Sequence, residues 1–100
     1  MKPVMIHSEA KAELDQAIGF YEARKEGLGA ELQCEVEDTI AKIQANPALG
    51  SPYKSTEIRF FLVHRFPFVV YYTETTEVIW VFAIAHGRQK PGYWRKRKIE

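Results

Sequence analysis

The stretch EIRFFLVHRFPFVVYYTETTEVIWVFAIAH, residues 57–86, decides the fold, because it is dominated by β-branched, aromatic and other apolar side chains. Such side chains favour strands, and over 57–64 they alternate along the chain with a period of two. Arg65-Phe66-Pro67 and Thr75-Thr76 interrupt the stretch with tight connections. It therefore predicts a meander of three antiparallel strands, over residues 57–64, 68–74 and 77–86.

Upstream of the meander, apolar residues follow the 3.6-residue period of amphipathic helices. One helix is predicted over 9–25 with Ser8 as its N-cap. A second runs from about Ala30 to near Asn46, because Pro47 disfavours helix at the residue before it. Since the link between them is short, we expect an antiparallel helix hairpin. The apolar stripes are Ala10, Leu14, Ala17, Ile18 and Tyr21, then Leu32, Val36, Ile40 and Ile43.

Residues 4–7 predict a short first strand at a sheet edge, where the preceding Pro3 is tolerated. The expected fold class is α+β: an N-terminal strand and a helix hairpin packed on an antiparallel sheet that contains the C-terminal meander. The place of the first strand within the sheet stays open. Residues 46–56, rich in turn formers, are expected to be a long loop.

The chain of 100 residues, with 46% hydrophobic and 27% charged residues, has the size and composition of one soluble domain, which we expect to span 1–100. Its longest apolar run, Val78–Ala85, is far shorter than the roughly 20 residues that cross a bilayer. No apolar stretch suggests a signal peptide. Its one cysteine fits a reducing compartment, so we expect a cytoplasmic protein with no membrane contact.

The net charge of +1 hides an asymmetry between the two halves of the chain. Residues 1–50 hold five Lys/Arg and nine Asp/Glu, whereas residues 51–100 hold nine Lys/Arg and four Asp/Glu. Six of those nine cations lie in the C-terminal tail, residues 87–100. Such a tail can present a phosphate-binding face, or it can be a solvated charged terminus.

The candidates for chemistry gather after the last strand. His86 ends that strand and can act as a general acid or base, and Arg88 follows it. Arg59, on the first meander strand, can share a groove with Arg88 or pair with a nearby glutamate. His86 can equally be a structural residue. The three histidines and one cysteine show no metal-ligand spacing, so no metal and no other cofactor are expected.

Aromatic residues are mixed with cations in the tail, at Tyr93, Trp94, Arg95 and Arg97. That mixture can stack bases and hold phosphates, or it can anchor a protein interface. For Trp94 the favoured interpretation is a cover over the sheet.

Several stretches resemble the RelE/ParE toxin superfamily of type II toxin–antitoxin systems. They are residues 12–22 and 35–47 in the helices, and Ile58-Arg59, RFPFVVYY (65–72) and VFAIAHGRQKPGYW (81–94) in the strands and tail. The resemblance implies this family's fold and a role as a toxin, as in plasmid stabilization and growth arrest. It also implies neutralisation by a cognate antitoxin, an extended segment of which wraps the toxin.

The resemblance leaves open which of two cellular targets the toxin acts on. The helices and the Tyr-Trp tail look more like the ParE branch, whose members inhibit DNA gyrase. That reading predicts target contacts through Lys54, Arg65, Arg88, Lys90, Tyr93, Trp94, Arg95 and Arg97. The alternative is a ribosome-dependent mRNA endoribonuclease like RelE, without a metal, in which His86, Arg59 and Arg88 would be catalytic. Whether the chain is an enzyme therefore stays open.

Overall fold

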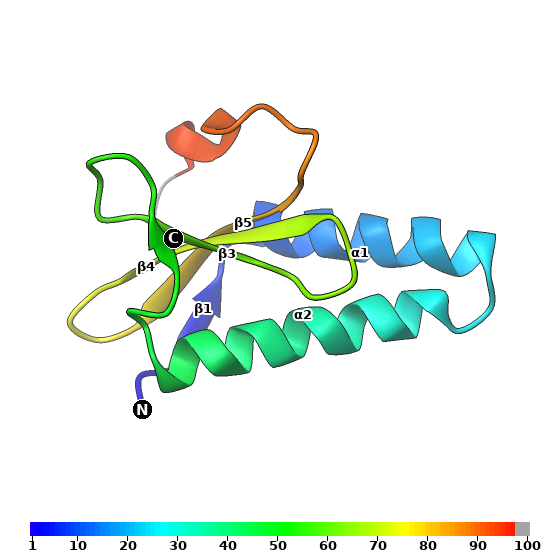
Figure 1. Ribbon diagram of the computed structural model, residues 1–100, viewed down its shortest axis with the longest axis horizontal. Coiled ribbons are helices and arrows are strands. Elements are labelled where there is room, and N and C mark those ends of the chain that lie inside the picture. The colour runs from blue at the N-terminus through cyan, green and yellow to red at the C-terminus, as the bar shows by residue number, and fades with distance from the viewer. Residues whose placement is uncertain (98–100) are drawn as a thin grey trace.

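A computed structural model describes residues 1–97 and confirms the expected α+β class, with two helices packed on one sheet (Figure 1). Residues 98–100, the end of the predicted tail, lie outside the described residues. The elements, in chain order, are β1 (Val4–Ile6), α1 (Ser8–Arg24), α2 (Leu28–Ala45), β2 (Ser51–Pro52), β3 (Arg59–Leu62), β4 (Phe68–Glu74), β5 (Ile79–His86) and a 3₁₀ turn, η1 (Tyr93–Lys96).

The sheet has the strand order β1-β5-β4-β3-β2, and its central part is the predicted antiparallel meander. β1 lies at an edge, as expected, but it pairs with β5 in parallel. The sheet is therefore mixed: the meander is antiparallel as expected, whereas the first strand, whose place was left open, corrects the antiparallel expectation by one parallel pairing. The parallel pairing follows from connectivity, because the helix hairpin and three strands separate β1 from β5 and allow a crossover.

Two local predictions need correction. The N-cap of α1 is His7 rather than Ser8, and the His7 Nδ1 atom accepts a hydrogen bond from the backbone N–H of Glu9 at 3.1 Å. The predicted loop 46–56 contains the short strand β2, which pairs with Phe60 and Arg59 of β3. Two residues are too few to show any periodicity, and Pro52 is tolerated because β2 is an edge strand.

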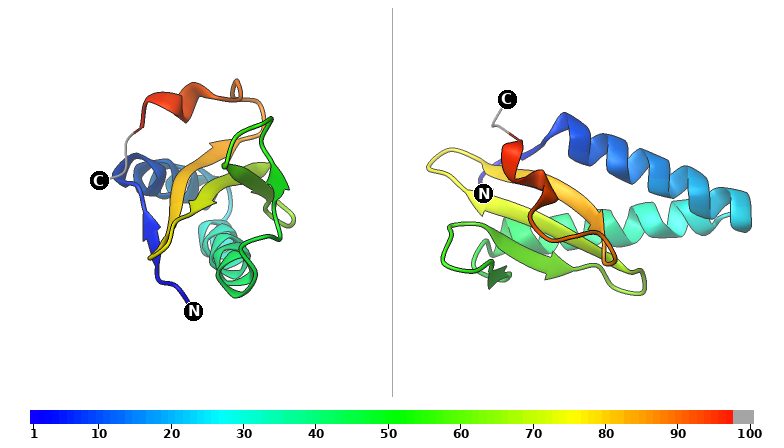
Figure 2. Two further views of the ribbon diagram at one scale, coloured as in Figure 1. Left: turned by 90° about the vertical axis from the view of Figure 1, so that its left-hand side faces the viewer. Right: turned by 90° about the horizontal axis from the view of Figure 1, so that it is seen from above.

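The helix hairpin covers one face of the sheet and the C-terminal tail crosses the other (Figure 2), and an apolar core lies on each face. On one face the helix hairpin packs its stripe, including Leu32, Val36 and Ile43, against the strands. On the other face the C-terminal tail crosses the sheet and buries Trp94 against Tyr53 and Tyr71. The meander therefore has no solvent-facing side along its centre.

A β-bulge at Phe82 reverses the side-chain alternation in β5. Tyr71 pairs with Ala83 and Tyr72 with Val81, so Phe82 is an extra residue in this strand. As a result Val81 faces the helices, whereas Ala83 faces the tail. The small side chain of Ala83 leaves room for the large ring of Trp94. Within residues 1–97, no helix is both long and apolar enough to cross a membrane.

Candidate functional site

The tail is held on the sheet by aromatic packing around Trp94. This indole is only 2% exposed, and its ring centroid lies 4.8 Å from that of Tyr71 and 5.2 Å from that of Tyr53. Phe82 stacks on its other side at 6.4 Å. The favoured interpretation of Trp94 as a cover over the sheet is confirmed by its burial. Because it is buried, it positions the tail and does not itself face a target.

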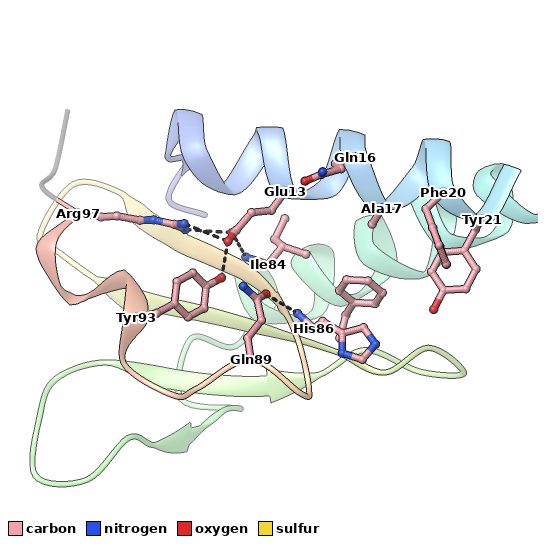
Figure 3. A pocket seen from close by; sticks show the side chains of 11 residues that line it. Glu13, Gln16, Ala17, Phe20, Tyr21, Ile84, His86, Gln89, Tyr93 and Arg97 are labelled. Carbon is pink, nitrogen blue, oxygen red and sulfur yellow. Dashed lines mark hydrogen bonds and ion pairs between the residues drawn. The ribbon is translucent and has the colours of Figure 1, made fainter. Parts of the chain in front are cut away.

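A carboxylate on α1 fastens the tail at its end (Figure 3). Arg97 donates to both oxygens of Glu13 at 2.9 Å, and its Nη1 also donates to the backbone carbonyl of Phe82. The Tyr93 hydroxyl donates to the same carboxylate, which also accepts the backbone N–H of Ile84 at 3.1 Å. Glu13 and Arg97 are largely buried, with side chains 18% and 11% exposed. Such charge-assisted, bidentate pairs give strong and directional attachment.

These contacts change the acid–base properties of the tail. Burial raises the pKa of the Tyr93 hydroxyl well above its usual value, and its hydrogen bond to Glu13 and the negative charge of Glu13 raise it further. The hydrogen bond to Glu13 also raises the pKa of the Arg97 guanidinium. Both groups therefore keep their protons to a higher pH than they would in water.

Three cations converge on a hollow between the tail and the loop before β3. The hollow has a volume of about 340 Å³, and Lys54, Lys90 and Arg95 line it together with Pro91, Gly92 and Tyr93. The Lys54 ammonium lies 5.4 Å and the Arg95 guanidinium 5.9 Å from the centroid of the Tyr53 ring. Among residues 1–97, no acidic residue lines the hollow and none forms an ion pair with these cations. We call it the basic hollow.

A larger, mostly apolar pocket of about 600 Å³ lies between α1, the start of β4 and the tail (Figure 3). His86 reaches it from the end of β5. The His86 ring packs edge-to-face on Phe68 at 5.3 Å, and its Nδ1 accepts the backbone N–H of Arg88 at 3.0 Å. That hydrogen bond leaves Nε2 as the protonated nitrogen of the neutral imidazole. The remaining lining includes Ala17, Phe20, Tyr21, Ile84 and Gln89.

The three catalytic candidates are not brought together. Arg59 pairs with Tyr72 in β4, whereas His86 pairs with Phe68, four residues away and thus about 13 Å along the strand. Arg59 also lies on the far side of β4 from β5. Its guanidinium donates to the Gly50 carbonyl at 2.7 Å, so it braces the loop before β2 rather than sharing a groove with Arg88.

The candidate target-binding cations divide into paired and unpaired ones. Arg65 pairs with Glu31 at 2.9 Å and with Glu35 at 3.5 Å, and these contacts raise its pKa. Arg97 pairs with Glu13, as described above. The cations without an ion pair among the described residues are Lys54, Arg88, Lys90 and Arg95. Tyr93 keeps 36% of its surface exposed beside the basic hollow.

Sequence reasoning missed Glu13, the central residue of the tail attachment. One signal was available, because Glu13 lies between Ala10 and Ala17 at helical spacing, on the buried face of α1. A carboxylate on such a face requires a partner. The partner lies 84 residues away, and no periodicity connects the two positions.

Comparison with solved structures places this fold among known ones. The chain matches a structure described as the chromosomal ParDE TA system from P. aeruginosa, with a TM-score of 0.65 and 20% identity. The match covers 86% of this chain and 96% of that one, and at this identity it shows a shared fold. A search of the curated proteins found no match to the chain.

Two helices packed on a five-strand mixed sheet are consistent with the RelE/ParE-like fold. Residues 4–91 match a family described as the ParE toxin of the type II toxin-antitoxin system parDE. The chain therefore belongs to the ParE toxin family, and the matched residues include both helices and all five strands.

Proposed function

We propose that this ParE-type toxin acts in the cytoplasm by inhibiting DNA gyrase, and that a cognate antitoxin neutralises it. Family membership supports the toxin class. The observation that carries the target contact is the basic hollow, where three cations that form no ion pair within residues 1–97 meet on one surface. Cations that lack internal partners are available to an anionic partner, and they steer its approach.

The target-binding residues predicted from the sequence take two roles in this proposal. Lys54, Arg88, Lys90, Tyr93 and Arg95 remain exposed and contact the target directly. Trp94, Arg97 and Arg65 act indirectly, because burial or ion pairing occupies them inside the chain. The burial of Trp94 and the pairing of Arg97 with Glu13 thus fix the position of Arg95 between them.

The large pocket supports the proposed neutralisation by an antitoxin. Phe20, at its rim, is 55% exposed although it is a large apolar side chain. An exposed aromatic residue beside an apolar pocket is typical of a surface that a partner covers. The occupant that fits is an apolar side chain from an antitoxin segment.

The alternative of an mRNA endoribonuclease receives less support. Its catalytic set needs His86 and Arg59 around one phosphate, yet they lie in strands on opposite sides of β4 and pair with β4 residues four positions apart. His86 could still act alone, so the experiment below discriminates the two activities.

The test is tightly controlled expression of the chain in bacteria without antitoxin, with DNA and protein synthesis followed separately by pulse labelling. We expect DNA synthesis to stop first, and purified chain to inhibit supercoiling by gyrase in vitro. Co-expression of the antitoxin encoded beside the gene should restore growth. If protein synthesis stops first and gyrase keeps supercoiling at micromolar excess of the chain, the gyrase proposal is wrong and the nuclease reading replaces it.

A further inference from the structure

Two tight turns build the basic hollow and hold its cations in place. Lys90-Pro91-Gly92-Tyr93 closes with a hydrogen bond from the Tyr93 N–H to the Lys90 carbonyl, and Gly92 has a φ of 90°. Proline in second and glycine in third position fit a type II turn, which needs positive φ at the third. Opposite it, the Thr56 N–H donates to the Tyr53 carbonyl, with Lys54 at a φ of 52°.

The aromatic ring of Tyr53 connects the two turns. Lys54 and Arg95 both lie within cation–π distance of this ring, so one aromatic surface fixes two charges from segments far apart in sequence. A methyl group at Gly92 would lie 3.2 Å from both the Tyr53 hydroxyl and the Arg95 Nε atom. The glycine therefore permits the close approach of the two walls of the hollow.

The hollow also borders a buried hydroxyl group. The Tyr53 side chain is 7% exposed, and its hydroxyl has no hydrogen-bond partner among the described residues. A buried donor without a partner is costly, and this one lies directly behind Gly92, where an added Cβ would be 3.2 Å from it. Among residues 1–97, the charged side chains that line the hollow are all cationic, so the hollow attracts anions rather than cations.

We propose that the basic hollow binds a phosphate group of a nucleic-acid backbone. The chain itself provides the contrast with a carboxylate site, because it holds the planar carboxylate of Glu13 with one bidentate arginine and a tyrosine hydroxyl. Three separate cations on different walls instead suit a tetrahedral group that presents oxygens in several directions. Tyr93, partly exposed at the rim, offers a ring on which a base can stack.

Phosphate binding by the hollow rests on the proposed function in one respect only, which is where the phosphate comes from. Gyrase handles DNA, so a toxin that contacts both the enzyme and its DNA would bind at their junction. The cations of the hollow would then contact the target through the DNA that gyrase holds, whereas exposed residues outside the hollow, such as Arg88, would contact the enzyme itself. Binding to DNA can be measured without gyrase, which separates the two proposals.

The experiment measures binding of the full chain to a fluorescent short DNA duplex over a range of salt concentrations. The variants are Lys54→Gln, Lys90→Gln and Arg95→Gln, and the matched controls are Lys96→Gln, in the same 3₁₀ turn but outside the hollow, and Lys11→Gln on α1. We expect each hollow variant to weaken binding about three- to tenfold and to reduce the salt slope by about one. The controls should retain both, and inorganic phosphate should compete with the duplex better than a polyglutamate peptide does.

Three results would overturn the phosphate site: an equal loss with Lys96→Gln, an unchanged salt slope in the hollow variants, or equal competition by the polyglutamate peptide. The first indicates a diffuse basic surface, and the last indicates an acidic protein as the partner. Thermal melting of each variant confirms that it is folded. If the chain binds DNA through the hollow but leaves gyrase active, only the gyrase proposal fails. If it inhibits gyrase while hollow variants bind DNA unchanged, only the phosphate site fails.

Discussion

The two faces of the sheet are covered in different ways, and the difference assigns them different roles. On the helix-covered face, α1 and α2 contribute long apolar stripes whose central residues, such as Leu32, Val36 and Ile43, are fully buried. On the tail-covered face, one short 3₁₀ turn places a single indole, Trp94, and is fastened mainly by the ion pair of Arg97 with Glu13. The helix-covered face stabilises the fold, whereas the tail-covered face holds the cations of the tail in position above the sheet.

The polar atoms reveal the same contrast. The only buried side-chain polar atoms without a partner among the described residues are the Tyr53 hydroxyl and the Trp94 Nε1, and both lie on the tail-covered face. On the helix-covered face the Tyr72 hydroxyl both donates to Pro47 and accepts from Gly50. Incomplete hydrogen bonding and a short covering segment lower the free energy of local opening. The tail-covered face should therefore open before the fold is lost.

The largest effect should come from the helix-covered face. Leu32→Ala removes a fully buried side chain at the centre of that core, and we expect it to lower the free energy of unfolding by about 3–5 kcal/mol. Urea denaturation followed by circular dichroism measures this change. The matched control is Leu62→Ala, because Leu62 is 67% exposed and should cost no more than about 0.5 kcal/mol. Similar losses in both variants would show that the helix-covered face is not the main source of stability.

A smaller effect, confined to the tail-covered face, should follow from Glu13→Gln. This change leaves the largely buried Arg97 without its bidentate partner, and we expect a loss of about 2 kcal/mol, between the values for buried and surface pairs. Hydrogen exchange should accelerate at the backbone amides of Arg95 and Arg97 while amides in α2 stay protected.

The control for this change is Glu9→Gln. Glu9 also faces Arg97, at 3.6 Å, but its side chain is 62% exposed, so its loss should cost under about 1 kcal/mol. Equal effects of the two substitutions on the tail amides would mean that Glu13 has no special part in fastening the tail.

The contrast between the faces also explains what could be predicted from the sequence. The helix-covered face depends on local periodicity, and residues 57–86 and the stripes of the two helices gave its strands and helices to within a few residues. Period alone could not reveal the parallel pairing of β1 with β5, because pairing depends on connectivity across most of the chain. The two-residue strand β2 is too short to have a period at all.

The tail-covered face depends instead on contacts between residues far apart in sequence. The composition of the tail drew attention to Lys90 and Arg95, which line the basic hollow, and the burial of Trp94 was anticipated. Whether a given cation is free or paired was not predictable, because Arg97 meets Glu13 across 84 positions. For the same reason the sequence could not show that Arg59 and His86 are held apart by the register of β4.

The smallest effect should appear only at alkaline pH, and it again separates the two faces. Burial, with help from Glu13, raises the pKa of Tyr93 far above the unfolded value of about 10. Above that pH the unfolded chain releases a proton that the folded chain keeps, so folding binds more protons and stability falls as pH rises. Below about pH 9 this contribution is constant. Tyr93→Phe removes the group, so its stability should fall less steeply than that of the wild type between pH 9 and 11.

Urea midpoints at pH 7, 9, 10 and 11 test this expectation, since lysine titration contributes equally to both proteins. At pH 7 the variant should be about 1 kcal/mol less stable, because the hydrogen bond to Glu13 is lost.

The matched comparison is Tyr72→Phe, which removes a buried hydroxyl from the other face of the sheet. Burial raises the pKa of Tyr72 as well, but its hydroxyl lies on the helix-covered face and accepts from Gly50, which opposes the shift. The fall in stability between pH 9 and 11 should therefore be reduced more by Tyr93→Phe than by Tyr72→Phe. Equal slopes in wild type and Tyr93→Phe would mean that the tail has already left the sheet before Tyr93 ionises, and that its attachment is weaker than the contacts of Glu13 and Arg97 indicate.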